Sequence, residues 1–387
     1  MKKFIFTICV LLIIMTFLMS SQNNIVQSEI TQKKIKVNKQ NNFNLKLNST
    51  ILLDEGKYES VRKHFPTGLS FNLIDKYNLF SNKIKYRIGF GSCNYQHNDQ
   101  GFWEKIIHFN PNLWIFLGDN VYTDKTNKWE ELLSKPSIDN MIDQYETLVS
   151  TIPFRKFMLK NSIEKIGIWD DHDYLINNSN VLENDNYKTV SKKLFTMFLN
   201  INEKHKMMQR EGIYTYYDLV ISNQHLVRFF MLDVRTFRTD IDILGTEQWT
   251  WLEESLSKSS ARVNILCSGS MVLSKINDYD SWFKNGWAYN RLINLLENLK
   301  IKNIIILSGD IHQGRLISKN NMIEIVSSPL SSPVTKHIGD NEYNIGNVVT
   351  VHNFGFIDIL NDKNQFYLVG GLIDFDGNLH NLIKITI

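Results

Sequence analysis

The feature that most constrains this chain is a series of short apolar runs, each followed directly by polar side chains that can bind metal. The runs are rich in Ile, Val, Leu and Phe, which is typical of buried strands. Parallel strands of an α/β sheet end at one edge, so the side chains that follow them converge there. The runs are 84–91, 113–118, 165–169, 226–232 and 303–308. The pattern therefore predicts a functional site at one edge of a sheet.

The side chains after these runs are a mixed set of potential metal ligands. In chain order they are Cys93, Asp119, Tyr122, Asp170, Asp171, His172, Asp310 and His312. A single Asp in such a place is usually a helix cap or turn residue, and a single Cys is usually a core residue. Their repetition at several strand ends favours a metal site over these structural alternatives. Such an acidic cluster needs more than one unit of cationic charge, so we expect two or more metal ions.

The donor types restrict which metals fit. Carboxylates suit hard cations such as Ca²⁺, Mg²⁺ and Mn²⁺, whereas the phenolate of Tyr122 and the thiolate of Cys93 favour ferric iron. A structural zinc site would need paired Cys or His residues close in sequence. Two metals can bind a phosphoryl group and activate water. Arg235 and Arg238 follow the fourth run and could bind phosphate, although pairing with surplus carboxylates is the structural alternative.

The N-terminus predicts export. Two lysines precede an apolar run at 4–19, and small and polar residues follow it, as in a secretory signal peptide. An uncleaved membrane anchor is the alternative, although a membrane span usually takes about 20 residues. We therefore expect a signal peptide at 1–21, a polar leader at 22–80 and a globular domain at 81–387. The expected location is the secretory pathway or another site outside the cytoplasm.

The rest of the sequence alternates strand-like and helix-like segments, which indicates one α/β domain with a β-rich C-terminal part. A further strand is expected at 262–268, and later strands are expected at 322–327, 355–360, 365–370 and 382–387. Helices are expected at 101–109, 138–150, 187–204, 246–257 and 287–300. The net charge of +3 is not concentrated in a basic run, so the sequence shows no footprint for nucleic acid.

Short motifs mark the strand ends in a fixed order. They are Gly91-Ser92-Cys93, Gly118-Asp119-x-x-Tyr122, Trp169-Asp170-Asp171-His172-Asp173-Tyr174, Leu232-Asp233-x-Arg235-x-x-Arg238 and Leu307-Ser308-Gly309-Asp310-x-His312. In this order, over about 84–360, they resemble the PhoD-like metallophosphatases of the calcineurin-like metallophosphoesterase superfamily. The resemblance implies a two-sheet αββα sandwich with metals at the strand ends. It also implies hydrolysis of phosphomonoesters or phosphodiesters by a metal-activated hydroxide, with Fe³⁺ and Ca²⁺, or with Mn²⁺ or Mg²⁺ in place of Ca²⁺.

The resemblance implies roles for individual residues as well. The expected iron-side ligands are Cys93, Asp119, Tyr122 and His312, with Asp119 as the bridging carboxylate. The expected ligands beyond them are Asp171, Asp310 and Asn177. His172 would be a catalytic histidine that its acidic neighbours keep protonated. Arg235 is expected to be catalytic as well, binding the substrate phosphate together with Arg238 and offsetting charge in the transition state. For Asp170 and Asp173, metal ligation and orientation of His172 are both open.

The chain departs from the family pattern close to the third motif. Leu175 and Asn178 stand where the family often has Gly and Asp. Asn177 also begins a glycosylation sequon, and a glycan there would exclude metal ligation. These departures lie next to the residues expected to bind the second metal.

Two other functions are consistent with the same residues. One is a phospholipase-type phosphodiesterase, and the other is a non-catalytic metal-binding interaction protein that keeps the fold. The expected partner is a phosphoester substrate, and membrane contact is expected only through an uncleaved N-terminal segment. The oligomeric state is open.

Overall fold

The computed structural model describes residues 70–73, 77–180, 185–222, 225–274, 280–299, 301, 304–320, 322–336, 339, 342–362 and 365–386. The expected signal peptide at 1–21 and most of the leader at 22–80 lie outside these residues. Among the helices that the structure describes, none has the length and apolar character needed to cross a membrane.

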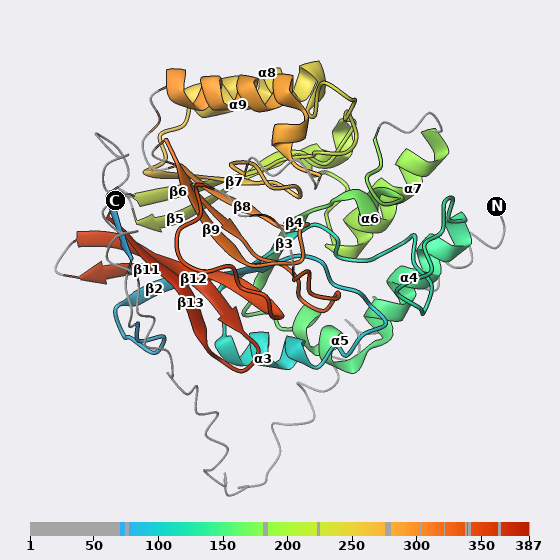
Figure 1. Cartoon of the computed structure of the whole chain (residues 1–387), viewed down its shortest axis with the longest axis horizontal. Coiled ribbons are helices and arrows are strands. Elements are labelled where there is room, and N and C mark those ends of the chain that lie inside the picture. The colour runs from blue at the N-terminus through green and yellow to red at the C-terminus, as the bar shows by residue number, and fades with distance from the viewer. Residues whose placement is uncertain are drawn as a thin grey trace, which may run out of the picture. The chain divides into compact units, whose positions relative to one another are not determined.

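A seven-stranded sheet forms one half of the fold (Figure 1). In spatial order its strands are β1 (Ser70–Leu73), β13 (Leu379–Thr386), β12 (Gln365–Asp374), β11 (Asn353–Asp362), β2 (Ile84–Gly91), β3 (Leu113–Leu117) and β4 (Glu164–Ile168). Strands β2, β3 and β4 are parallel, so their carboxyl ends lie at one edge. Strand β1, from the stretch expected to be a leader, pairs with β13.

A six-stranded sheet forms the other half. Its strands are β5 (Thr215–Ser222), β6 (His225–Met231), β7 (Val263–Cys267), β8 (Ile304–Ser308), β10 (Met322–Val326) and β9 (Arg315–Lys319). Strands β6, β7, β8 and β10 run parallel, whereas β5 and β9 pair antiparallel with β6 and β10. A Cβ atom on Gly370 of β12 would lie 3.2 Å from Ile325 of β10, so the two sheets are in direct contact.

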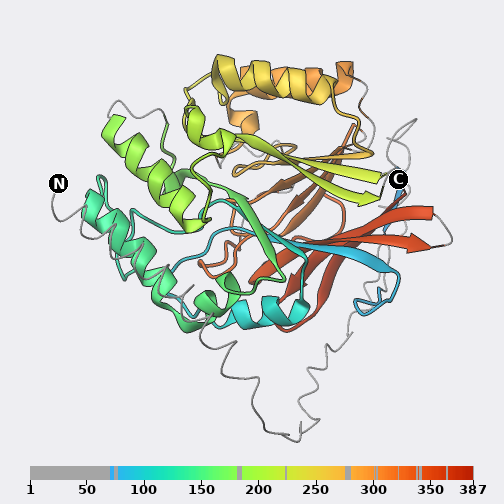
Figure 2. The same ribbon diagram turned by 180° about the vertical axis from the view of Figure 1, so that it is seen from behind.

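Helices cover the outer faces of both sheets (Figures 1 and 2). The longer helices are α3 (Phe102–Phe109), α4 (Ile138–Ser150), α5 (Ile152–Met158), α7 (Asp185–Phe198), α8 (Gly245–Ser257) and α9 (Gly286–Asn298), with short turns at Lys206–Gln209 and Trp282–Lys284. The four-residue helix α6 (Asp171–Tyr174) is instead buried at the strand ends. Trp103 of α3 packs on Trp114 of β3 at 5.6 Å and on Phe157 of α5 at 4.5 Å between ring centroids. Trp249 of α8 and Leu292 of α9 join the buried core of the six-stranded sheet. The predicted two-sheet sandwich with outer helices is confirmed.

Most of the predicted elements are present, but one helix boundary was wrong. The helix expected at 187–204 ends at Phe198, because Asn200 adopts a left-handed backbone conformation with φ of 53°. Asn tolerates this conformation and commonly ends helices. Strands β5 and β9 and helix α5 were missed. Strand β9 and helix α5 are short, and in all three elements polar residues interrupt the apolar pattern.

Two cross-strand ion pairs provide a matched test of how burial affects stability. Arg87 of β2 faces Asp358 of β11 in register, and two of its nitrogens lie 2.8 Å from the carboxylate oxygens in a buried position. Arg228 of β6 faces Asp218 of β5 in the same way, but this pair is partly exposed.

We expect Asp358→Ala to lower the free energy of unfolding by about 3–5 kcal/mol, because it leaves a buried guanidinium without its carboxylate. Asp218→Ala should change it by less than about 1 kcal/mol, since water can solvate Arg228. Urea unfolding followed by circular dichroism would measure both. Equal shifts in the two variants would contradict the role assigned to burial.

Candidate metal centre

The site lies where the parallel strands of both sheets end. The residues after β2 are tied to the residues after β3 by main-chain bonds, with Cys93 N donating to Gly118 O at 3.2 Å and Asn94 N donating to Asp119 O at 2.8 Å. Ser92 Oγ, after β2, donates to Ser327 O, after β10, at 2.8 Å. These bonds join the edges of the two sheets and bring together side chains that are distant in sequence.

Among the described residues, three overlapping groups of side chains could each hold a metal ion. They are Cys93, Asp119 and His312; Asp119, Asp170, Asp171 and Asp310; and Asp119, Asp171 and His172. Within each group, one ligand atom from every residue lies within 4.8 Å of the others. Asp119 belongs to all three groups, which is the position that a bridging carboxylate would occupy.

Four of these residues have an uncommon backbone conformation. The φ angles of Cys93, Asp119, Asp310 and His312 are 58°, 49°, 74° and 54°, in the left-handed region. Each residue in this conformation lowers the folding stability by about 1–3 kcal/mol, and such residues cluster at functional sites. Gly118 has φ of 98°, and a Cβ atom there would lie 2.6 Å from the Cβ of Asp170. The turn after β3 therefore requires glycine.

Several buried carboxylate oxygens lack a hydrogen-bond donor. Their surroundings show whether a metal ion would fit. Oδ1 of Asp119, Oδ2 of Asp170, Oδ1 of Asp171 and Oδ2 of Asp310 are buried and accept no hydrogen bond. Burial and neighbouring negative charge raise the pKa of both Asp119 and Asp310 well above the usual range. Buried charges need a partner, and oxygen atoms of this kind are the ligands that hard cations prefer. These residues fit a metal centre.

Softer donors gather at one side of Asp119. Cys93 Sγ lies 3.3 Å from Asp119 Oδ2, and Tyr122 Oη lies 2.9 Å from His312 Nε2. Burial, together with the nearby charge of His172, lowers the pKa of His312 to about 4. The imidazole of His312 is therefore neutral at neutral pH, which is the form that ligates metal.

His172 is oriented by an aspartate that the strand-end pattern did not single out. Its Nδ1 lies 2.7 Å from Oδ1 of Asp124, which is buried. Burial alone would lower the pKa of His172, but the carboxylates of Asp171 and Asp124 outweigh it and raise the pKa above the usual value. Asp124 comes two residues after Tyr122 at the same strand end. Its position at this strand end is the sequence signal from which Asp124 could have been predicted.

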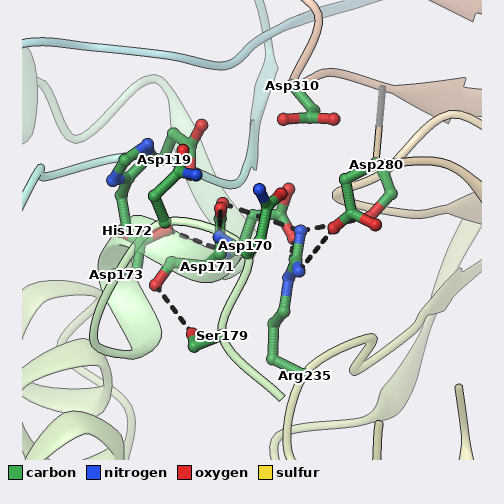
Figure 3. A network of polar contacts seen from close by, with 12 residues as sticks. Asp119, Asp170, Asp171, His172, Asp173, Ser179, Arg235, Asp280 and Asp310 are labelled. Carbon is green, nitrogen blue, oxygen red and sulfur yellow. Dashed lines mark hydrogen bonds and ion pairs between the residues drawn. The ribbon is translucent and has the colours of Figure 1, made fainter. Parts of the chain in front are cut away.

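The acidic residues that follow β4 lie in different surroundings (Figure 3). Asp173 accepts hydrogen bonds from the main-chain N–H groups of Asn120, Val121 and Asp170, at 2.9, 3.1 and 3.0 Å. It belongs to none of the metal-binding groups and braces the turn after β3. Asp170 Oδ1 instead accepts from Arg235 Nε at 2.5 Å.

The two arginines lie among carboxylates. Arg235 is fully buried, and besides Asp170 it contacts Asp280 Oδ2 at 2.7 Å and Asp171 Oδ1 at 3.6 Å. Arg238 is also buried and bonds Asp280 and Asn285. Asp280 follows no strand, so the pattern that predicted the other residues gave no signal for it.

Asn177 lies at the rim of this cluster. It is exposed, and its main-chain N–H donates to Asp124 Oδ2 at 2.8 Å. The next residue, Asn178, donates its main-chain N–H to Asp171 Oδ2 at 2.5 Å. This turn therefore anchors Asp124 and Asp171, and ligation by the Asn177 side chain stays a prediction.

Comparisons with known proteins agree with this geometry. Residues 88–357 match the family model described as PhoD-like phosphatase. A solved structure described as "Structure of PhoD" superposes with a TM-score of 0.58 at 15% identity, covering 76% of this chain and 71% of that one. None of the curated proteins matches the chain.

Two other solved structures share the fold. Purple acid phosphatase PPD1 from yellow lupin (Lupinus luteus) has a TM-score of 0.53 at 12% identity, covering 78% of this chain and 53% of that one. GAP50, described as the anchor in the inner membrane complex of Plasmodium, has a TM-score of 0.51 at 13% identity, covering 78% and 89%. The family match spans most of the sandwich and all the strand-end motifs. The chain therefore belongs to the PhoD-like phosphatase family and is a phosphoric ester hydrolase.

Proposed function

We propose that this chain hydrolyses phosphoesters with the help of ferric iron and calcium, bound together at the strand-end cluster. The observation that carries the proposal is the position of Asp119, which is shared by a group with thiol and imidazole donors and a group of carboxylates only. Thiolate, imidazole and phenolate donors suit ferric iron as a strongly Lewis-acidic ion, whereas the carboxylates suit calcium, or Mn²⁺ or Mg²⁺ in its place. Export through the secretory pathway, expected from 1–21, is a separate proposal.

The ligands follow from the two groups. Cys93, Tyr122 and His312 would hold iron, and Asp119 would bridge to the second metal. Asp170, Asp171 and Asp310 each have a buried oxygen free of hydrogen bonds for the second metal. When bound, the metal ions would lower the pKa of an attacking water and offset charge on the phosphoryl group.

His172 is suited to donate a proton. Asp124 holds its Nδ1, so Nε2 is the nitrogen that can face a substrate. Asp171 and Asp124 raise the pKa of His172 above its usual value, which favours the protonated imidazole that a proton donor needs. We propose that it donates this proton to a phosphate oxygen or to the leaving oxygen.

The contacts of the arginines favour a role besides phosphate binding. Arg235 has no exposed surface, and its guanidinium contacts Asp170, Asp171 and Asp280. We propose that it positions Asp170 and Asp171 for the second metal, with Asp280 fixing its far side. The phosphate contact expected for Arg235 and Arg238 stays a prediction.

We expect purified protein to show the purple absorbance of a phenolate-to-iron charge-transfer band, and Tyr122→Phe to lose it. The phenolate oxygen is the donor of that transition, so removing it removes the band even where iron remains bound. Visible absorbance beside iron analysis would measure both properties. Protein that is fully active without iron and without the band would refute the iron assignment.

We expect Asp119→Asn to lose iron, the second metal and activity together, because one carboxylate serves both groups. Metal analysis would be run beside assays on a panel of phosphomonoesters and phosphodiesters. Asp376→Asn, at an exposed turn, is the control. Loss of only one metal would argue against bridging, and a wild-type preference for diesters would favour the phospholipase-type alternative. Metal-loaded wild type that cleaves none of the panel would favour a non-catalytic role.

We expect Asp280→Asn to weaken binding of the second metal about 10-fold to 100-fold, the usual effect of removing an outer partner of a ligand. Titration with a competing chelator would measure the affinity. Asp218→Asn, at the exposed arginine pair, is the matched control. A raised KM with unchanged metal affinity would indicate that Arg235 contacts the phosphate instead.

A further inference from the structure

A short loop after Tyr122 lies against the metal centre and is held in one shape. Leu133 N donates to Asp124 O at 2.7 Å across the base of the loop. Lys125 and Leu132 form an isolated antiparallel bridge, and Tyr95 Oη donates to Thr126 O at 2.7 Å. The loop 124–133 is therefore a fixed part of the site and carries its own side chains into it.

Trp129 is the large aromatic side chain of this loop. Its ring centroid lies 5.2 Å from that of Tyr122 and 5.6 Å from that of His312, two of the candidate metal ligands. Tyr95 supports it edge-on at 5.1 Å. Trp129 is only half-buried, whereas the tyrosines behind it are buried. The indole of Trp129 is therefore next to the metal centre and is also partly open to solvent.

Lys125 keeps the indole in place. Its Nζ lies 4.4 Å from the centroid of the Trp129 ring and donates to the main-chain O of Trp129 at 2.6 Å. A cation over an indole stabilises the pair, and more so where water is excluded. Lys125 is itself 9% exposed, so its charge is largely withheld from solvent.

The same loop holds the proton donor. Asp124, its first residue, bonds His172, and the ring of His172 lies 4.1 Å from that of Tyr122. His172, on α6, and Trp129, on the loop, therefore both pack against the ring of Tyr122. A leaving group that receives a proton from His172 must pass close to Tyr122, and Trp129 is the neighbouring surface that is open to it.

We propose that Trp129, supported by Lys125, forms a leaving-group subsite that favours phosphoesters with a flat aromatic leaving group. The inference rests on the proposed function, because it assigns the subsite to the same phosphoester centre. An indole stacks on planar rings with little dependence on their substituents, so aryl and nucleoside esters would both fit. Small alkyl esters would gain nothing from it.

The test compares phenyl phosphate with methyl phosphate on metal-loaded protein. Trp129→Ala should lower the ratio of the two kcat/KM values about tenfold or more, the range seen when a stacking aromatic is removed. Trp129→Phe should keep most of the ratio. Trp287→Ala removes a half-exposed tryptophan from α9 and is the matched control, with no change expected.

Binding provides a readout that does not depend on turnover. Calorimetry should show phenylphosphonate binding more tightly than methylphosphonate, and Trp129→Ala should remove that difference without changing metal content. Unchanged ratios and affinities in Trp129→Ala would overturn the subsite. If wild type hydrolyses no ester but its preference for phenylphosphonate still depends on Trp129, the proposed function fails and the subsite stands.

Discussion

The repulsion between buried carboxylates is the constraint on which the rest of this structure depends. Asp119, Asp170 and Asp171 are buried and approach one another and the partly buried Asp310, where water screens their charges poorly. Like charges at such separations in a medium of low polarity are unfavourable, so protons, cations or metal ions must compensate them. The protein supplies part of this compensation through Arg235 and His172 and leaves selected oxygens unpaired. The unpaired oxygens mark where metal charge is needed.

Backbone geometry, more than side-chain packing, sets the directions of the ligands. Strands from the two sheets end at the same place. Residues in the turns after them adopt the left-handed backbone conformation, which is rare outside glycine and is common at functional sites. Asp173 accepts three main-chain N–H groups and so fixes the turn that carries Asp119. The backbone strain of these turns is compensated only when the surrounding sandwich is folded. This dependence explains why a metal centre and a large core occur in one unit.

The sequence predicted the strand ends well because their signal is local. An apolar run followed by a ligand-type residue is visible within ten residues, and Cys93, Asp119 and His312 were found in this way. Asp280 and Asp124 were missed because their importance comes from distant partners, Arg235 and His172. Strand β5 was missed for a related reason, since an edge strand that is half exposed lacks a continuous apolar run. Local patterns therefore indicate candidate ligands better than they indicate the residues that would orient them.

The stretch Asp170 to Asp173 shows how one turn of helix separates adjacent charges. In an extended strand, alternate side chains would point the same way and their carboxylates would meet. Here α6 begins at Asp171, and successive side chains of a helix point about 100° apart. Asp170 therefore reaches Arg235, His172 reaches Asp124, and Asp173 reaches the turn after β3. Asp171, together with the free Oδ2 of Asp170, is left for the candidate metal groups, so the change from strand to helix at this point gives adjacent residues different partners.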